Sequence, residues 1–230
     1  MAVARKLFEL CGIETERVFS PFCWRTRMAL AHKGLDVETR ATPFTGIGQM
    51  TGGFSRTVPV LEDHGARISD SFAIALHLEE TYPEAPSLFG GAGGRALSRF
   101  VESWANSLHG PILKAVILDI HDRLAPDDRA YFRDSREKRF GTTLEALQAD
   151  RETHREAFRA SLLPMRLMLK AQPFIGGEAP LFADYILFGT LQWPRMVSDF
   201  PMLAEGDAVA AWFERCLDLH DGLGRMALRR

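Results

Sequence analysis

The sequence predicts an α/β domain with the element order βαβ followed by ββα, joined to an all-helical second domain. Three observations predict this division. Short apolar runs of strand length alternate with helical segments in the first eighty residues. A stretch rich in proline and glycine follows at residues 83–94. Beyond it, apolar residues recur at helical spacing and strand alternation is absent.

Composition excludes several classes of protein. The chain has 230 residues, of which 46% are hydrophobic and 25% charged, so we expect a folded core rather than disorder. Its 28 basic and 30 acidic residues give a net charge of -2, which argues against a nucleic-acid binder. We expect no membrane span, because no apolar run approaches about 18 residues. We also expect no signal peptide, because Glu9 interrupts the apolar patch after Arg5 and Lys6.

Cysteine usage indicates the compartment. The three cysteines, Cys11, Cys23 and Cys216, are too few and too scattered for a disulfide framework or a zinc site. We therefore expect a reducing, cytoplasmic setting. The run Asp119, His121 and Asp122 lacks a second cluster of ligands, so we expect no metal.

The elements of the first domain follow in order. Residues 6–11 form an apolar run typical of a buried strand. Ser20 and Pro21 predict a helix start, and Gly34 its end near residue 33. The alternation at 35–38 predicts a second strand, and residues 45–53 a glycine-rich loop. Two strands at 58–61 and 66–69 flank a hairpin turn, and a helix from residues 69–71 ends before Pro83.

The second domain is predicted from helical periodicity. A helix is expected over residues 95–121, with a kink at Pro111. Residues 133–170 are a further helical region, and 183–193 are apolar on all sides, as in a buried helix. The last helix is expected at 207–220, capped by Asp207. The predicted boundaries are 1–85 for the first domain, 86–94 for a linker and 95–230 for the helical domain.

Three motifs carry a family resemblance. They are Ser-Pro-Phe-Cys-Trp-Arg at residues 20–25, Val-Pro at 58–59 and Ser-Asp-Ser at 69–71. Together they resemble the glutathione S-transferase superfamily, over the whole chain, and imply a thioredoxin-like first domain. Further segments look like the bacterial β-aryl-etherase type, which has fungal relatives: residues 44–47, 70–75, 183–185, 192–193, 217–218 and 221–223.

Ser20 is the predicted catalytic residue. At a helix N-terminus, its hydroxyl and the first amides can stabilise the thiolate of bound glutathione. The resemblance to serine-type members implies the same role; the alternative is a plain helix cap. Cys23 stands where a Cys-x-x-Cys motif has its second cysteine, but a small buried helix residue is the simpler interpretation.

Glutathione itself is the expected co-substrate, with no metal. The resemblance implies a cis Val58-Pro59 peptide that presents the Val58 backbone to the ligand. Asp70 and Ser71 can bind the γ-glutamyl amine and carboxylate, although a double helix cap is the alternative. Of Arg40 and Arg56, we favour Arg56 for the glycine carboxylate. Phe22 is expected to contribute to the same glutathione site.

The acceptor substrate is expected between the domains. Besides Phe22, the candidates on the first helix of the second domain are Trp104, Leu108, His109 and Pro111. Aromatic side chains suit a planar hydrophobic electrophile, although core packing is the alternative for each. Asp184 is predicted to be structural, near the start of a buried helix. The capping box usual in relatives is incomplete, because Leu181 stands where they have a hydroxyl.

These observations lead to one function with two alternatives. We expect a glutathione S-transferase that conjugates glutathione to a hydrophobic electrophile, or cleaves an aryl ether, as in detoxification. A glutathione-dependent isomerase of the maleylacetoacetate-isomerase kind and a non-catalytic glutathione-binding protein remain open. The resemblance also implies a homodimer, with no nucleic-acid or membrane partner.

Overall fold

The structure is a computed structural model that describes residues 5–227. It contains a four-stranded mixed sheet in the order β2-β1-β3-β4. The central strand β1 pairs in parallel with β2 and antiparallel with β3, which in turn pairs with β4. The strands are β1 (Arg5–Leu10), β2 (Glu38–Thr42), β3 (Val60–Asp63) and β4 (Ala66–Ser69).

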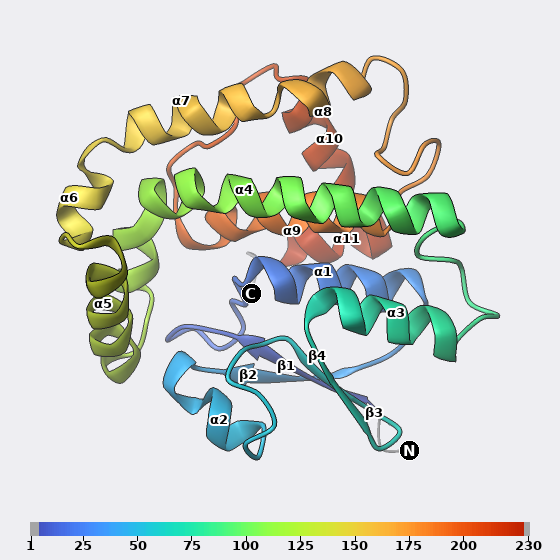
Figure 1. Cartoon of the computed structure of the whole chain (residues 1–230), viewed down its shortest axis with the longest axis horizontal. Coiled ribbons are helices and arrows are strands. Elements are labelled where there is room, and N and C mark those ends of the chain that lie inside the picture. Colours follow the sequence, from blue (N-terminus) through green and yellow to red (C-terminus); the bar gives the residue numbers. More distant parts are fainter. Residues whose placement is uncertain (1–4, 228–230) are drawn as a thin grey trace.

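Helix α1 (Pro21–His32) lies between the sheet and the rest of the molecule (Figure 1). Its N-cap is Ser20, and it ends where Gly34 adopts a φ of 65°. The amide of Gly34 donates to the Ala31 carbonyl and that of Leu35 to the Leu30 carbonyl, which is the Schellman pattern. The predicted start of the second strand, at residue 35, is therefore wrong. Leu35 belongs to the helix end, and β2 begins only at Glu38.

Helix α3 (Ser71–Thr81) follows β4 directly, and the prediction of βαβ followed by ββα is confirmed. The predicted glycine-rich loop contains a 3-10 turn, η1 (Phe44–Gly46), and the short helix α2 (Ile47–Met50). Among described residues from 92 onward there are helices and no strand, so the helical second part is confirmed as well. These helices are α4 (Ala92–Asp122), α5 (Pro126–Phe140), α6 (Leu144–Ala149), α7 (Arg151–Ser161), α8 (Leu163–Met168), α9 (Phe182–Val197), α10 (Ala208–Leu217) and α11 (Leu219–Met226).

The helix boundaries differ from the prediction at several places, and the helical region predicted from residue 133 begins with α5 at Pro126. Helix α4 begins at Ala92, inside the segment predicted as a linker. The last predicted helix is too long, since α10 ends at Leu217 and residues 220–222 have positive φ values. Asp207 does cap α10, with its carboxylate accepting from the Val209 amide. The domain boundaries themselves stay a prediction.

Helix α4 carries an irregularity, but not where proline predicts it. The non-helical dihedral angles lie at Val116 (φ -130°, ψ 18°), roughly one and a half turns beyond Pro111. The cause is the buried side chain of Gln148, whose Oε1 accepts from the Leu118 amide at 2.8 Å. A side chain that takes a helix amide interrupts the helical hydrogen-bond ladder. The kink predicted at Pro111 is therefore corrected to Val116.

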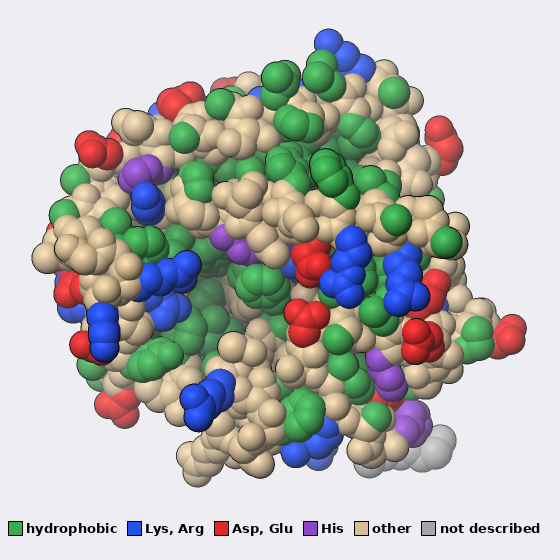
Figure 2. Space-filling model, in the orientation of Figure 1, with side chains coloured by type: hydrophobic (Ala, Val, Ile, Leu, Met, Phe, Trp, Pro, Cys, Tyr) green, Lys and Arg blue, Asp and Glu red, His purple; other side chains and the backbone are tan. Residues whose placement is uncertain are grey.

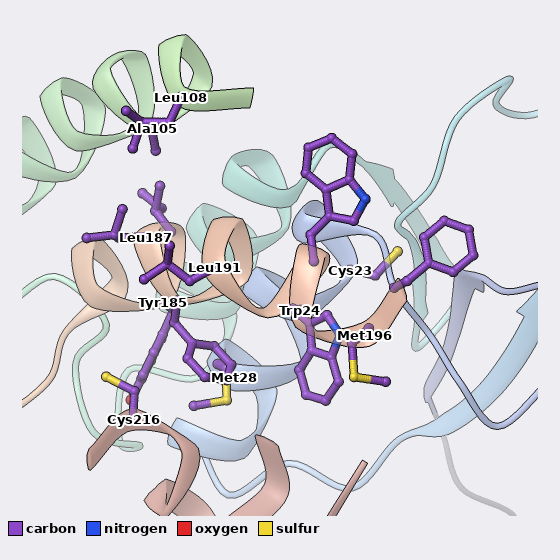
Figure 3. Packing of buried hydrophobic residues seen from close by; sticks show 14 of the residues in the cluster. Cys23, Trp24, Met28, Ala105, Leu108, Tyr185, Leu187, Leu191, Met196 and Cys216 are labelled. Atoms are coloured by element: carbon purple, nitrogen blue, oxygen red, sulfur yellow. The ribbon is translucent and has the colours of Figure 1, made fainter. Parts of the chain in front are cut away.

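The core is centred on α9, which is buried along almost its whole length between α1 and α4 (Figure 3). A Cβ at Gly189 would lie only 2.3 Å from the carbonyl oxygen of Pro21, so glycine is required for the close approach of α9 to the start of α1. This contact holds the N-terminus of α1 against the helical part. Within residues 5–227, no helix is long and apolar enough to cross a membrane.

Candidate functional site

A cavity of about 900 Å³ opens beside the N-terminus of α1. Its walls come from the starts of α1 and α3, the segment before β3, one face of α4, and α5. Figure 2 shows this hollow below α4, with an apolar floor and Lys or Arg side chains on its α5 side. The volume lies in the upper part of the range of roughly 300–1,000 Å³ typical of small-molecule sites.

Ser20 lies in the wall of the cavity, with only 4% of its surface exposed. Its Oγ accepts a long hydrogen bond, 3.4 Å, from the amide of Cys23. A hydroxyl that accepts one bond still has its own hydrogen to donate. Within residues 5–227 no oxygen or nitrogen accepts that hydrogen, and the neighbouring Cys23 thiol is the nearest side chain that interacts with the hydroxyl. Ser20 can therefore cap α1 and donate to a ligand at the same time.

The residues predicted for glutathione lie together along one side of the cavity. Val58, Pro59, Asp70, Ser71 and Arg56 all line it, and the Val58-Pro59 peptide is cis, as the resemblance implied. By contrast, Arg40, the other candidate cation, does not line the cavity. It lies on β2 and forms an ion pair with Glu38 at 2.6 Å.

Asp70 and Ser71 differ in how their side chains are satisfied. The Asp70 carboxylate caps α3, and its Oδ1 accepts from the amides of Phe72 and Ala73 at 2.9 Å each. The Ser71 hydroxyl is buried and has no hydrogen-bond partner among residues 5–227. A buried hydroxyl without a partner is costly and uncommon. Its position in the cavity wall makes a ligand the natural acceptor.

Arg25 ties the start of α1 to α4. It is fully buried, and its guanidinium lies 4.6 Å above the ring of Phe22. Its Nη2 donates to Asn106 Oδ1 at 3.2 Å, and its Nη1 lies 3.8 Å from Glu102 Oε1. Burial lowers the pKa of Arg25 to about 10, so it stays charged at neutral pH. Through this packing, Arg25 fixes Phe22 beside Ser20.

His109 contributes a neutral imidazole to the cavity. Burial, with a further effect of the nearby Arg25 charge, lowers the pKa of His109 to about 3. Its ring lies edge-on to Phe22 and Trp193, at centroid distances of 5.5 and 5.6 Å. Thr190 Oγ1 donates to the Ile186 carbonyl, so it accepts from His109 Nε2 at 3.1 Å. This leaves His109 Nδ1 as a hydrogen-bond acceptor.

The other acceptor-site candidates do not line the cavity. Leu108 is 1% exposed and points with Ala105 toward α9, as Figure 3 shows, so it belongs to the core. Trp104 is half-buried against the same core, and Pro111 is also outside the lining. Of the α4 candidates, the structure brings only His109 to the cavity, while Phe22 reaches it from α1.

Helix α5 supplies a wall that the sequence analysis did not predict. The lining side chains are Tyr131, Phe132, Arg136, Arg139 and Phe140. The spacing of positions 132, 136 and 140 places them on one helix face. That spacing was visible in the sequence, but it does not tell which element the face meets.

Asp128 attaches this wall to the first part of the chain. It is 1% exposed, and its carboxylate accepts from the amides of Phe44 and Thr45 at 2.7 and 2.8 Å. The Thr45 hydroxyl donates to the same carboxylate at 2.7 Å. The rings of Phe44 and Phe132 pack below it, 5.9 Å apart. Asp128 therefore sets the width of the cavity between η1 and α5.

None of the chain's own thiols is suited to be a nucleophile. All three cysteines are free and buried, and burial raises the pKa of Cys11 to about 11 and of Cys23 to about 12. Burial raises the pKa of Cys216 as well. The part of the chain that the structure describes holds no cluster of three metal-ligating side chains.

Asp184 has the structural role predicted for it. Its buried carboxylate accepts from the amides of Ile175, Gly176 and Leu181 and from the indole of Trp212. Burial raises its pKa, and these donors act in the opposite direction. The acceptor role of the missing hydroxyl is taken by the Leu181 carbonyl, to which the Asp184 amide donates at 2.9 Å.

Comparisons with known proteins agree with this architecture. The family descriptions "Glutathione S-transferase, N-terminal domain" and "Glutathione S-transferase, C-terminal domain" match residues 19–81 and 96–218. A glutathione S-transferase-like protein of Aspergillus flavus is 27% identical over 218 residues, 78% of this chain and 75% of that protein. A crystal structure of a glutathione transferase from Phanerochaete chrysosporium superposes with a TM-score of 0.75 at 27% identity, covering 95% of this chain and 92% of that one.

A shorter match is to a relative with a different activity in its name. A maleylacetoacetate isomerase of Dictyostelium discoideum is 32% identical over 112 residues, which cover 46% of this chain and 51% of that protein. The match to this relative therefore spans only about half its length. The C-terminal family description alone covers more than half of the present chain, and the N-terminal description precedes it in the family's order. The chain belongs to the glutathione S-transferase family.

Proposed function

We propose that the protein is a glutathione transferase in which Ser20 stabilises the thiolate of bound glutathione. The observation that carries this proposal is the Ser20 hydroxyl, free to donate, in the cavity wall at the N-terminus of α1. The buried Cys23 thiol three residues later cannot take the role, because its pKa is raised to about 12. The reacting sulfur is therefore brought by the co-substrate.

The energetic demand on Ser20 is modest. A free thiol has a pKa of about 8.5, and each unit of depression requires about 1.4 kcal/mol of preferential interaction with the thiolate. One hydrogen bond to a charged group supplies about 1.5–3 kcal/mol. The partial positive charge of the α1 N-terminus adds about 0.3–1 kcal/mol. Together these effects amount to about 1.8–4 kcal/mol, which lowers a thiol pKa of about 8.5 to roughly 5.6–7.2.

The remaining groups of glutathione have matching partners along the same wall. Asp70 supplies a carboxylate for the γ-glutamyl amine, and the unpartnered Ser71 hydroxyl supplies a donor for the adjacent carboxylate. The Val58 backbone lies at the cavity and can pair with the peptide as a strand would. Arg56, an exposed cation at the cavity edge, suits the glycine carboxylate.

The electrophile is placed by the aromatic side of the cavity. Phe22 and Trp193 flank His109, and Phe44, Tyr131 and Phe132 face them from η1 and α5. Aromatic walls suit a planar, hydrophobic acceptor. We propose conjugation of such an electrophile, or cleavage of an aryl ether of the β-aryl-etherase type, in which the thiolate displaces a halide or an aryloxide.

Calorimetry and one substrate panel test the proposal. We expect glutathione to bind, and we expect turnover within a panel of lignin-type β-aryl ethers, aryl halides and disulfides, each assayed with glutathione. Ser20→Ala is expected to lower the rate at least about 10-fold, since it removes a hydrogen bond to a charged sulfur. Absence of glutathione binding, or an equal rate in Ser20→Ala, would overturn the assignment.

The similarity to a maleylacetoacetate isomerase over about half of the chain supports one second candidate. In this isomerase reaction, the glutathione thiolate adds to a cis-enone diacid and leaves again after rotation about the former double bond, so that glutathione is not consumed. Turnover of such a diacid at constant glutathione concentration would favour this function over conjugation. Binding of glutathione with its thiol still at the solution pKa would instead indicate a non-catalytic binding protein.

We also propose that the chain forms a homodimer and works in the cytoplasm. Three buried free cysteines are consistent with a reducing compartment, and closed two-fold dimers are the commonest assemblies of soluble proteins. Analytical ultracentrifugation decides the first point: a sedimenting mass near twice 25.8 kDa is expected, and a monomer at micromolar concentration would contradict it.

A further inference from the structure

The charges that line the cavity are unequally distributed. Among the described residues the lining includes three arginines, Arg56, Arg136 and Arg139, and a single carboxylate, Asp70. His109 is neutral there, because its pKa is about 3. Asp70 and Arg56 belong to the side assigned above to glutathione. The aromatic side on α5 therefore carries two positive charges and no negative one.

Neither α5 arginine has an acidic partner. Within residues 5–227, no carboxylate lies within ion-pair distance of Arg136 or Arg139. Arg133, one turn earlier on the same helix, is the contrast: it pairs with Glu137 at 2.8 Å and Glu145 at 2.9 Å. Arg133, outside the cavity, is thus paired with carboxylates, whereas Arg136 and Arg139, which line the cavity, are not.

The position of Arg136 is defined by aromatic packing. Its guanidinium lies 4.6 Å above the ring of Phe132 and 5.5 Å from that of Phe44. These two rings also line the cavity, so the charged group lies beside the surface where a flat substrate would stack. Arg136 Nη1 also donates to Ser135 Oγ at 2.8 Å. Burial lowers the pKa of Arg136 and the nearby Arg139 charge acts in the same direction, while Tyr131 acts in the opposite one. An anion placed here would relieve both effects.

We propose that the acceptor substrate is an aromatic compound with an anionic group, such as a carboxylate, that binds to Arg136 and Arg139. The inference rests on the proposed transferase function and specifies the substrate class of that site. The planar guanidinium groups suit bidentate binding of a carboxylate, while the aromatic rings hold the apolar body. Glutathione does not need these groups, because its own charged ends have Asp70, Ser71 and Arg56 on the opposite side.

A pair of non-reactive probes tests the proposal without turnover. We would saturate the protein with S-methylglutathione, which fills the glutathione side, and titrate 2-naphthoate and 2-naphthamide by calorimetry. The two probes share one ring system and differ in charge. In the wild type, we expect naphthoate to bind about 10-fold more tightly than naphthamide, as suits a hydrogen bond to a charged group.

Three variants identify the groups responsible. Arg136→Gln and Arg139→Gln are expected to weaken naphthoate binding about 10-fold and about 3-fold, and to change naphthamide binding less than 2-fold. Lys138→Gln removes the same charge from an exposed position on α5 outside the cavity lining, and is expected to change neither affinity. An unchanged dissociation constant for S-methylglutathione verifies that each variant is folded. If Arg136→Gln does not fold, Arg139→Gln and the wild-type probe ratio decide.

The outcomes separate this inference from the proposed function. Failure of S-methylglutathione to bind the wild type would refute the transferase assignment. Equal affinity for the two naphthalene probes, with S-methylglutathione bound, would refute only the anionic substrate. If the arginine variants weakened S-methylglutathione instead of naphthoate, these residues would serve the co-substrate and the inference would be wrong. Equal losses in Lys138→Gln would reduce the effect to net charge and would contradict a defined site.

Discussion

Removing the charge of Asp128 tests whether α5 is held against η1 as the structure indicates. The carboxylate accepts from two amides and one hydroxyl at 2.7–2.8 Å. In Asp128→Asn only one oxygen remains, and the new amide group faces donors. Hydrogen bonds to a charged group are worth about 1.5–3 kcal/mol each. Because Thr45 is exposed and water can replace part of the loss, we expect a net destabilisation of about 2–4 kcal/mol.

This loss is measurable as a melting temperature. For a chain of about this length, 1 kcal/mol corresponds to roughly 2–4 °C, so Asp128→Asn should melt about 4–16 °C lower. A looser α5 wall should also weaken 2-naphthoate binding more than S-methylglutathione binding. Asp134→Asn, an exposed position on the same helix, is the matched control and should melt within about 1 °C of the wild type. A wild-type melting temperature in Asp128→Asn would refute the argument that this carboxylate fastens α5.

Three further predictions concern the site. Ser71→Ala should weaken glutathione binding about 10-fold and leave stability unchanged, because its hydroxyl has no partner in the structure; a lower melting temperature with unchanged affinity would contradict this. The pKa of His109 falls from 6.5 in the unfolded chain to about 3, so the unfolded state binds the extra proton below pH 6.5. The stability linked to neutral His109 is complete above pH 6.5 and should fall by about 2 kcal/mol at pH 5, and urea unfolding of His109→Gln should lack this portion of the pH dependence. Cys23→Ala should keep glutathione turnover within about 2-fold, since its buried thiol has a pKa near 12; a loss above 10-fold would assign the chemistry to Cys23.

The first part of the chain was the more predictable from sequence. Its strands, its cap at Ser20 and the motifs around Val58 and Ser71 depend on neighbouring residues, and local patterns record them. The start of β2 was predicted too early, because the Leu35 amide bonds to the Leu30 carbonyl at the end of α1. Apolar alternation alone does not distinguish such a helix end from the start of a strand. Local signals thus place elements to within a few residues.

The acceptor side was less predictable, because it depends on contacts between distant segments. The hydrogen bonds between Asp128 and residues 44–45 join positions more than eighty apart, and the periodicity of apolar residues does not predict them. The same reason explains the kink at Val116, which depends on Gln148. Leu108 and His109 are adjacent in sequence, yet one faces the core and the other the cavity. Only the packing of α4 against α9 decides between them.

The pKa of the glutathione thiol in the bound state tests the central claim most directly. Ultraviolet absorbance of the thiolate, titrated against pH, measures it in the wild type, in Ser20→Ala and in Thr143→Ala. The last variant removes a helix cap at α6, outside the cavity lining, where Thr143 Oγ1 accepts from the Ala146 amide at 3.2 Å. We expect a bound thiol pKa at least one unit below the free value of about 8.5 in the wild type and in Thr143→Ala. Ser20→Ala should raise it by about one unit or more, and an identical pKa in all three proteins would contradict the role of Ser20.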